Sequence, residues 1–137
     1  MPPDPERVLE VRSWFVKGDE VFRSARAGLA AVPPITGDAA FHAQQAVEKA
    51  MKGFLTWHDR RFRKTHNLVE LGQACAAVEP ALGPLLARSA PLTDYVWRFR
   101  YPGDADPPLV PEAEAALVLA RKAYDGLLKR LPPEVRP

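Results

Sequence analysis

Three long stretches without proline carry apolar residues at helical spacing, and this pattern limits the possible folds more than any other feature. In the first stretch the pattern ends before Pro33 and Pro34, because proline cannot continue a helix and restricts the residue before it. The apolar positions that recur there are Val8, Val11, Phe15, Phe22, Ala25 and Leu29. No alternating strand pattern, internal repeat or glycine-rich phosphate loop is found in the sequence. The pattern predicts an all-α protein.

Two further helices are expected in the middle of the chain. The second should start after Gly37, with Asp38 as its N-cap, and continue to about His58. The third should start at Asn67, with Glu70 spaced as the reciprocal partner in the cap. A basic segment, residues 60–64, connects the two.

The last part of the chain predicts two more helical segments. One covers residues 85–99 and is expected to be bent or split near Pro91. Residues 102–108 include three prolines and should form an exposed loop. Pro111 suits the first position of the final helix. Together these elements predict an up-and-down antiparallel bundle of four to five helices.

Length and composition predict a single domain, and the net charge is close to neutral. Its 137 residues, 47% of them apolar, are enough for one packed core, so we expect one domain over residues 1–137 with a core from about 8 to 131. The formal net charge of +2 gives no global case for nucleic-acid binding, and any basic function must be local.

The cysteine count and the N-terminal residues predict a cytoplasmic protein. Cys75 is the single cysteine and falls within an apolar helical pattern, as buried structural thiols do. The sequence starts without a basic segment followed by an apolar run, and no stretch is long and apolar enough for a membrane span. We therefore expect no membrane association.

The second predicted helix has two sides of different character. One side is an ordinary core stripe, formed by Ala43, Val47, Ala50, Phe54 and Trp57. The other side mixes large apolar residues with polar ones, namely Gln44, Gln45, Glu48 and Lys52. This mixture suggests partial burial against another helix or subunit. The alternative is a solvated face on which the Glu48–Lys52 pair, at the favourable i,i+4 spacing, contributes about 0.3 to 0.5 kcal/mol.

Three segments in this order resemble the HEPN family. Residues 41–52 resemble the family's signature helix, in which a Gln-x-x-Glu-Lys-x-x-Lys core is matched by Gln45, Glu48, Lys49 and Lys52. Residues 65–71 resemble the Thr-His-Asp/Asn-Leu segment that opens the third helix. Residues 100–102 resemble the Arg-Tyr-Pro that closes the fourth. The resemblance extends from about residue 11 to residue 131.

The resemblance implies a helical bundle that is commonly dimeric and that, in bacteria and archaea, is often encoded beside a minimal nucleotidyltransferase. We therefore expect a nucleotide- or RNA-binding partner module in a two-component, toxin–antitoxin-like system, with a homodimer and a nucleotidyltransferase as partners. The candidate nucleotide- or RNA-binding residues are Gln45, Glu48, Lys52, His66, Arg98, Arg100 and Tyr101. The aromatic residues Trp97, Phe99 and Tyr101 either stack on a base or belong to the core.

The sequence departs from the catalytic pattern of the family. HEPN ribonucleases resemble one another in an Arg followed four to six residues later by a His near the fourth helix, and no histidine follows Arg100 here. Arg61 and His66 have that spacing, but they precede the third helix, so we interpret the match as coincidence. No catalytic residue is assigned, which weighs against an enzyme. The alternatives are a divergent ribonuclease, with Arg100 and either His66 or Tyr101 as proton carrier, and a purely structural dimer.

No cofactor or metal is expected. His42 and His58 have no carboxylate or cysteine at ligand spacing. We interpret the basic segment 60–64 as a solvated loop, with contact to phosphate as the alternative. Arg100 has the stronger claim to phosphate, or alternatively forms an ion pair with Glu48 or Asp94.

Overall fold

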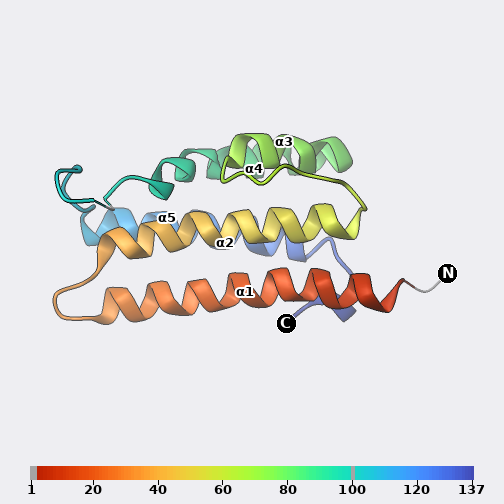
Figure 1. The fold of residues 1–137 in the computed structure, drawn as a ribbon, viewed down its shortest axis with the longest axis horizontal. Helices are drawn as coiled ribbons and strands as arrows, with labels where there is room; N and C mark the ends of the chain where they lie inside the picture. The colour runs from red at the N-terminus through yellow and green to blue at the C-terminus, as the bar shows by residue number, and fades with distance from the viewer. Residues whose placement is uncertain (1–2, 100) are drawn as a thin grey trace.

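The computed structural model describes residues 3–99 and 101–137 (Figure 1). Five α-helices, with no strand in the described part, confirm the predicted all-α bundle. In chain order they are α1 (Pro5–Ala30), α2 (Thr36–Trp57), α3 (Leu68–Val78), α4 (Gly83–Ser89) and α5 (Val110–Leu128). Three short 3-10 segments join or follow them: η1 (Pro80–Leu82), η2 (Ala90–Val96) and η3 (Pro133–Val135). None of the described helices combines the length and the apolar character that crossing a membrane requires.

Helix α2 is the central element of the bundle. It runs antiparallel to α1, lies beside α5, and is covered on its remaining side by α3 and η2 (Figure 1). The predicted core stripe is buried at Ala43, Val47, Ala50 and Phe54, and Trp57 is partly buried. Because neighbours contact α2 from several directions, its polar side is enclosed as well.

Two glycines allow α1 to approach its neighbours closely. A Cβ atom on Gly53 of α2 would lie 2.8 Å from Phe15 Cε2 and 3.0 Å from Trp14 Cβ. A Cβ atom on Gly18 of α1 would lie 2.7 Å from Cε2 of Tyr124, whose hydroxyl donates a hydrogen bond of 2.7 Å to the Phe15 carbonyl oxygen. The close contact at Gly53 brings Trp14 onto the surface of α2.

The predicted start of α2 is wrong by about two residues. The helix begins at Thr36, and Ile35 occupies the N-cap position without a side-chain hydrogen bond. Asp38 therefore lies in the first turn, where its charge is near the positive end of the helix dipole, and it is not the cap.

The predicted cap of α3 is confirmed in part. Asn67 Oδ1 accepts hydrogen bonds from the backbone amides of Val69 and Glu70, at 2.9 and 3.3 Å. The Glu70 carboxylate forms an ion pair with Arg63, at 2.9 Å, so it takes a different partner from the one that a capping box would give it.

The predicted split of the fourth helix is confirmed. The α-helical hydrogen bonding of α4 gives way to 3-10 geometry at Ala90, directly before Pro91. Residues 102–107 are exposed, as expected of a loop. The final helix starts at Val110, so Pro111 is its second residue and not its first.

Candidate functional site

A buried carboxylate on α2 is the centre of the polar cluster. Glu48 is 4% exposed. Its Oε2 accepts a hydrogen bond from Lys52 Nζ at 3.1 Å, and its Oε1 lies 2.7 Å from His66 Nδ1 and 3.2 Å from Gln44 Nε2. These four residues form what we call the Glu48 cluster. Because the three donors converge on one carboxylate, the burial of its charge is compensated.

The same contacts keep Glu48 ionised. Burial by itself raises the pKa of Glu48, but the hydrogen bonds from His66 and Gln44 and the charge of Lys52 outweigh it and hold the pKa below the ordinary value of 4.5. An ionised carboxylate can only accept, so the proton in the 2.7 Å contact belongs to Nδ1 of His66. The His66 side chain is 61% exposed, and Nε2 is its ring nitrogen available to a ligand.

Two glutamines extend the cluster along α2. Gln44 is fully buried, and its Nε2 donates both to Glu48 and, at 2.9 Å, to the backbone oxygen of His66. Its Oε1 accepts a hydrogen bond of 2.7 Å from Gln45, whose own Oε1 accepts one of 3.2 Å from Lys49. Since the Gln44 amide uses both its donor and acceptor atoms, its orientation is fixed, and it ties His66 to α2.

Two aromatic rings cover Lys52. The ammonium group lies 5.9 Å from the Trp14 ring centre and 5.8 Å from the Phe62 ring centre, and the rings meet edge-to-face at 6.4 Å. Trp14 comes from α1 and Phe62 from the basic segment. The Glu48–Lys52 pair is therefore buried within one chain, and the alternative of a solvated face is wrong.

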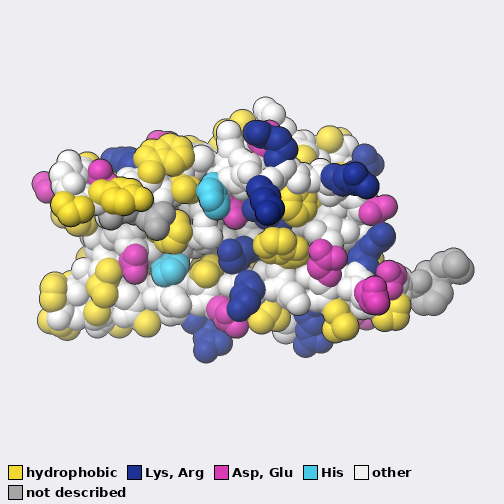
Figure 2. All heavy atoms as spheres, in the orientation of Figure 1, with side chains coloured by type: hydrophobic (Ala, Val, Ile, Leu, Met, Phe, Trp, Pro, Cys, Tyr) yellow, Lys and Arg dark blue, Asp and Glu magenta, His cyan; other side chains and the backbone are white. Residues whose placement is uncertain are grey.

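The basic segment 60–64 is anchored by its aromatic residue. Phe62 is partly buried on Lys52, while Arg60, Arg61, Arg63 and Lys64 are exposed. On the face seen in Figure 2, Lys and Arg side chains gather over the C-terminal part of α2 and the segment that follows it. The anchoring keeps these cations at the surface, and Lys64 precedes the exposed His66 by two residues in sequence.

A hollow of about 500 Å³ lies beside this segment, between the start of α1 and the end of α2. Arg7, Arg60, Arg61 and Thr56 line it together with the acidic side chains of Asp4, Glu6, Glu10 and Asp59. Arg7 forms an exposed ion pair of 3.5 Å with Asp59. The acidic residues make this hollow itself a poor site for phosphate, in contrast to the surface around His66.

The family model for the HEPN domain matches residues 11–130. The chain belongs to the HEPN family. No curated protein and no solved structure gives a significant match. Membership of the HEPN family indicates a nucleotide- or RNA-related function, and the match covers the Glu48 cluster and the basic segment.

The structure of this HEPN domain brings together four of the predicted site residues. Gln45, Glu48, Lys52 and His66 belong to one connected set of hydrogen bonds. Their convergence follows from the helical spacing of the first three and from the cap of α3, which places His66 against α2.

The other predicted residues occupy a different segment. Arg98 places its guanidinium over the ring of Phe99, at 4.7 Å, and the amide of Tyr101 donates to Asp104 at 2.9 Å. Trp97 is 55% and Tyr101 67% exposed, so neither belongs to the core. Arg100 lies outside the described residues. We call the described residues 97–99 and 101 the second region.

Four residues of the HEPN site were missed by sequence reasoning as binding residues or supports: Trp14, Gln44, Phe62 and Thr93. Thr93 of η2 accepts a hydrogen bond of 3.1 Å from the backbone amide of Leu68, which fixes the start of α3 next to His66. The position of Gln44 on the polar side of the second helix could have indicated its role from the sequence. No sequence pattern indicated the roles of Trp14 and Thr93, because these roles depend on which elements pack together.

The thiol of Cys75 is buried, and the described side chains show no cluster of metal ligands. Cys75 is fully buried, and burial raises the pKa of its thiol to about 12, so it is neither a ligand nor a nucleophile near neutral pH. Across residues 3–99 and 101–137, His, Cys, Asp and Glu side chains form no group of three that could hold a metal ion.

Proposed function

We propose that this HEPN domain binds a nucleotide or an RNA segment at the surface formed by His66 and the basic segment 60–64. The observation that carries the proposal is the 2.7 Å contact between Glu48 and Nδ1 of His66. It fixes an otherwise exposed imidazole, with Nε2 left for a ligand. A buried ionised carboxylate is a costly support for a surface histidine that has no role.

The chemistry of this surface suits a nucleic-acid ligand. In its neutral form His66 accepts at Nε2 from a ribose hydroxyl or a base N–H, and in its protonated form it donates to a phosphate oxygen. Lys64, an exposed cation two residues before His66 in sequence, adds an ammonium group that donates to phosphate oxygens. Glu48 is too deeply buried to touch the ligand and acts as a positioning residue.

Binding of fluorescein-labelled single-stranded RNA, followed by anisotropy with ATP as competitor, tests the proposal. His66→Ala should weaken RNA binding about tenfold, the effect of losing one hydrogen bond to a charged group. Lys64→Ala should lower the salt dependence of log K by about 0.7 for one lost contact with single-stranded RNA.

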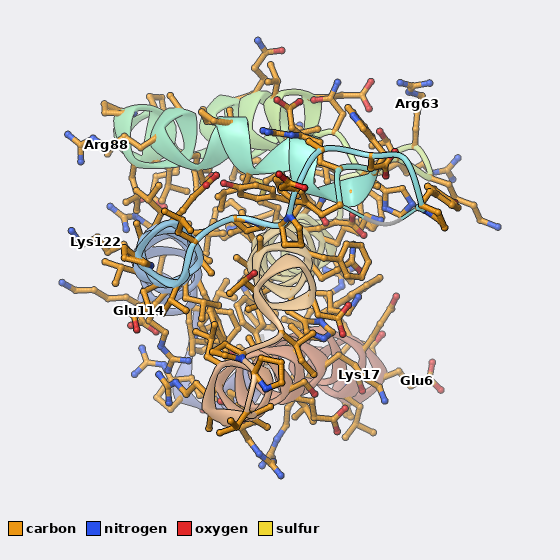
Figure 3. The ribbon with its side chains drawn as sticks, turned by 90° about the vertical axis from the view of Figure 1, so that its left-hand side faces the viewer. Glu6, Lys17, Arg63, Arg88, Glu114 and Lys122 are labelled. Atoms are coloured by element: carbon orange, nitrogen blue, oxygen red, sulfur yellow. The ribbon has the colours of Figure 1, made fainter. Side chains whose placement is uncertain are left out.

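Arg88→Ala is the matched control. Arg88 is an exposed arginine on α4, and Figure 3 shows it on the opposite side of the molecule from Arg63. It should bind RNA as the wild type does. The proposal fails when neither RNA nor ATP binds, or when His66→Ala and Lys64→Ala bind as tightly as Arg88→Ala.

We further propose that the domain acts in the cytoplasm as a homodimer, with a minimal nucleotidyltransferase as the second component of a toxin–antitoxin-like system. Its support is membership of a family in which this arrangement is common. Mixing the protein with the product of the gene beside its own, followed by size-exclusion chromatography with light scattering, tests the second component. Separate elution of the two proteins would contradict the proposed transferase partner. It would not affect the proposal of a ligand site at His66.

A second candidate function is RNA cleavage, and the Glu48–His66 contact favours it, because a carboxylate that orients an imidazole is a recurrent arrangement for a general base. His66 Nε2 would take the proton of a ribose 2′-hydroxyl. The resulting oxygen would attack the adjacent phosphorus, giving a 2′,3′-cyclic phosphate, and the 5′-oxygen would leave with a proton from solvent. Cleavage of a labelled RNA by the wild type that is abolished in His66→Ala would establish it. Intact RNA in both samples would contradict RNA cleavage, and RNA or nucleotide binding would then be the function that stands.

A further inference from the structure

The hollow beside the basic segment has no part in the contacts proposed at His66. Its volume of about 500 Å³ is within the range of about 300 to 1,000 Å³ that small-molecule sites have in proteins. Four acidic and three basic side chains line it, together with Thr56 and Phe62. A lining of both signs favours a neutral ligand that carries hydrogen-bond donors and acceptors side by side.

Part of this lining is already engaged. Asp4 Oδ1 accepts a hydrogen bond of 3.0 Å from the backbone amide of Glu6 and caps α1. Arg7 of α1 is paired with Asp59, which follows the end of α2. The ion pair joins the two elements that form the walls of the hollow, and it leaves the other charged side chains for a ligand.

Two carboxylates and two guanidinium groups remain. Glu6 and Glu10 lie one turn apart on α1, and Arg60 and Arg61 follow α2. All four side chains are exposed. Within the described residues, no hydrogen bond or ion pair engages any of the four. They are therefore available to a ligand in the hollow.

An aromatic ring supplies the apolar part of the lining. Phe62 lines the hollow and is held in place by its edge-to-face contact with Trp14. Glu10 precedes Trp14 by one turn of α1, and the two line a neighbouring hollow together. Arg61 directly precedes Phe62 in the chain. One carboxylate and one guanidinium group are thus attached next to the aromatic pair.

This combination of groups matches the hydrogen-bonding pattern of guanine. The N1–H and N2–H donors of guanine lie side by side, so they can bond both oxygens of one carboxylate. Its O6 and N7 acceptors match the fork of an arginine. Adenine and cytosine each place a single amino group beside an acceptor nitrogen, so neither offers a carboxylate two donors. A base carries no phosphate charge, so the acidic lining does not repel it.

We infer that the hollow binds a guanine base of the RNA strand whose backbone lies at the His66 surface. Glu10 accepts from N1–H and N2–H, Arg61 donates to O6 and N7, and the base packs against Phe62. Unstacked bases of single-stranded RNA are read at these two edges and on aromatic rings. The inference rests on the proposed function and adds a base preference to it.

Phe62 connects the hollow to the Glu48 cluster. It lies over the ammonium group of Lys52, which bonds the carboxylate that orients His66. Four residues separate Phe62 from His66, so their Cα atoms are at most about 14 Å apart. Figure 3 shows Glu6 of the hollow on the same side of the molecule as Arg63 of the basic segment. One short strand can therefore reach both sites.

Fluorescence anisotropy with a labelled oligouridine that contains one guanosine tests the inference. Three further RNAs carry adenosine, inosine or 7-deazaguanosine in place of the guanosine. Inosine lacks the N2 amino group, and 7-deazaguanosine lacks the N7 acceptor. The wild type should bind the guanosine RNA about tenfold more tightly than the adenosine RNA, and the other two should bind with intermediate affinity.

Two variants separate the two edges of the base. Glu10→Gln replaces one acceptor oxygen by an amide donor, so guanosine and inosine RNAs should bind it equally. Arg61→Ala removes the fork, so guanosine and 7-deazaguanosine RNAs should bind it equally. Glu114→Gln and Arg88→Ala are the matched controls, since Figure 3 shows both residues on the opposite side of the molecule from Glu6. Both controls should keep the full preference.

The outcome is separable from that of the site at His66. A wild type that binds all four RNAs equally overturns the inference and does not affect the site at His66. A guanosine preference over inosine that survives in Glu10→Gln, or over 7-deazaguanosine that survives in Arg61→Ala, also overturns it. A protein that binds none of the RNAs contradicts the proposed function and the inference together.

Discussion

The Glu48 cluster and the second region contain similar residue types but are built differently. In the cluster, Glu48 and Lys52 are 4% and 8% exposed; a hydrogen bond connects Glu48 to His66, and the Lys52 ammonium lies over the Trp14 ring of α1. In the second region, Arg98 and Tyr101 are exposed, and their contacts are with neighbours in sequence. One set of polar residues is part of the bundle, whereas the other lies on its surface.

The backbone accounts for much of this difference. Helix α2 repeats every 3.6 residues, so Gln44, Glu48 and Lys52 stay on one line for more than two turns. The second region follows the end of η2, and Phe99 adopts φ of 66°, in the left-handed region that bulky residues rarely occupy. Without a regular helical repeat, side chains are not aligned along one face.

The largest effect should come from removing the central carboxylate. Glu48→Ala leaves the Lys52 ammonium buried without its partner and should lower the free energy of unfolding by about 3 to 5 kcal/mol. Urea unfolding followed by circular dichroism measures it. The matched control is Glu112→Ala, near the second region, where the exposed carboxylate accepts a 2.9 Å hydrogen bond from Tyr95. Glu112→Ala should lower the free energy of unfolding by about 1 kcal/mol. Equal losses in the two variants would contradict the comparison.

A smaller decrease in the free energy of unfolding should follow from adding a methyl group between α1 and α2. Gly53→Ala places a Cβ atom 2.8 Å from Phe15 Cε2, so the helices must separate, at a cost of about 1 to 3 kcal/mol. Urea unfolding measures the loss. Gly28→Ala is the control, because its Cβ would meet the Ile35 oxygen at 3.5 Å and the Ile35 Cβ at 3.7 Å, both ordinary contacts, and the helix gains from alanine. A neutral Gly53→Ala would show that the close approach is not needed.

The pH dependence of the cluster should be visible in Glu48→Gln. Because the folded pKa of Glu48 lies below the ordinary value of 4.5, its carboxylate stabilises the fold above that pH, and this contribution is lost as the pH falls through the folded pKa. The stability difference between wild type and Glu48→Gln should therefore stay constant from pH 7 to about 5 and shrink below about 4.5. Urea midpoints at each pH measure it. A difference that stays constant down to pH 3 would contradict the assigned direction.

The smallest effect should come from the second region. Arg98→Ala removes an exposed side chain and should change the free energy of unfolding by less than about 0.5 kcal/mol. Thermal unfolding by calorimetry measures it. A loss above about 1 kcal/mol would show that this segment is held as firmly as the cluster. Measuring RNA affinity on the same variant tests the separate prediction that Arg98 contacts the ligand.

Much of the fold was predictable because its signals are local. The apolar spacing of α1, α2 and α5 and the prolines between the helices gave the elements within a few residues. The Asn67 cap was predictable for the same reason, since its hydrogen bonds join adjacent residues. The start of α2 was not, because Ile35 takes the cap position without any side-chain hydrogen bond.

The sequence by itself determined the helical bundle, the family and the polar side of α2, because helical spacing and local motifs encode all three. Only the tertiary structure decided that this polar side is buried, that His66 bonds to Glu48, and that Trp14 and Phe62 cover Lys52. These contacts join residues from α1, α2 and the segment before α3. Their physical reason is the close packing of helices on α2, which no local pattern records.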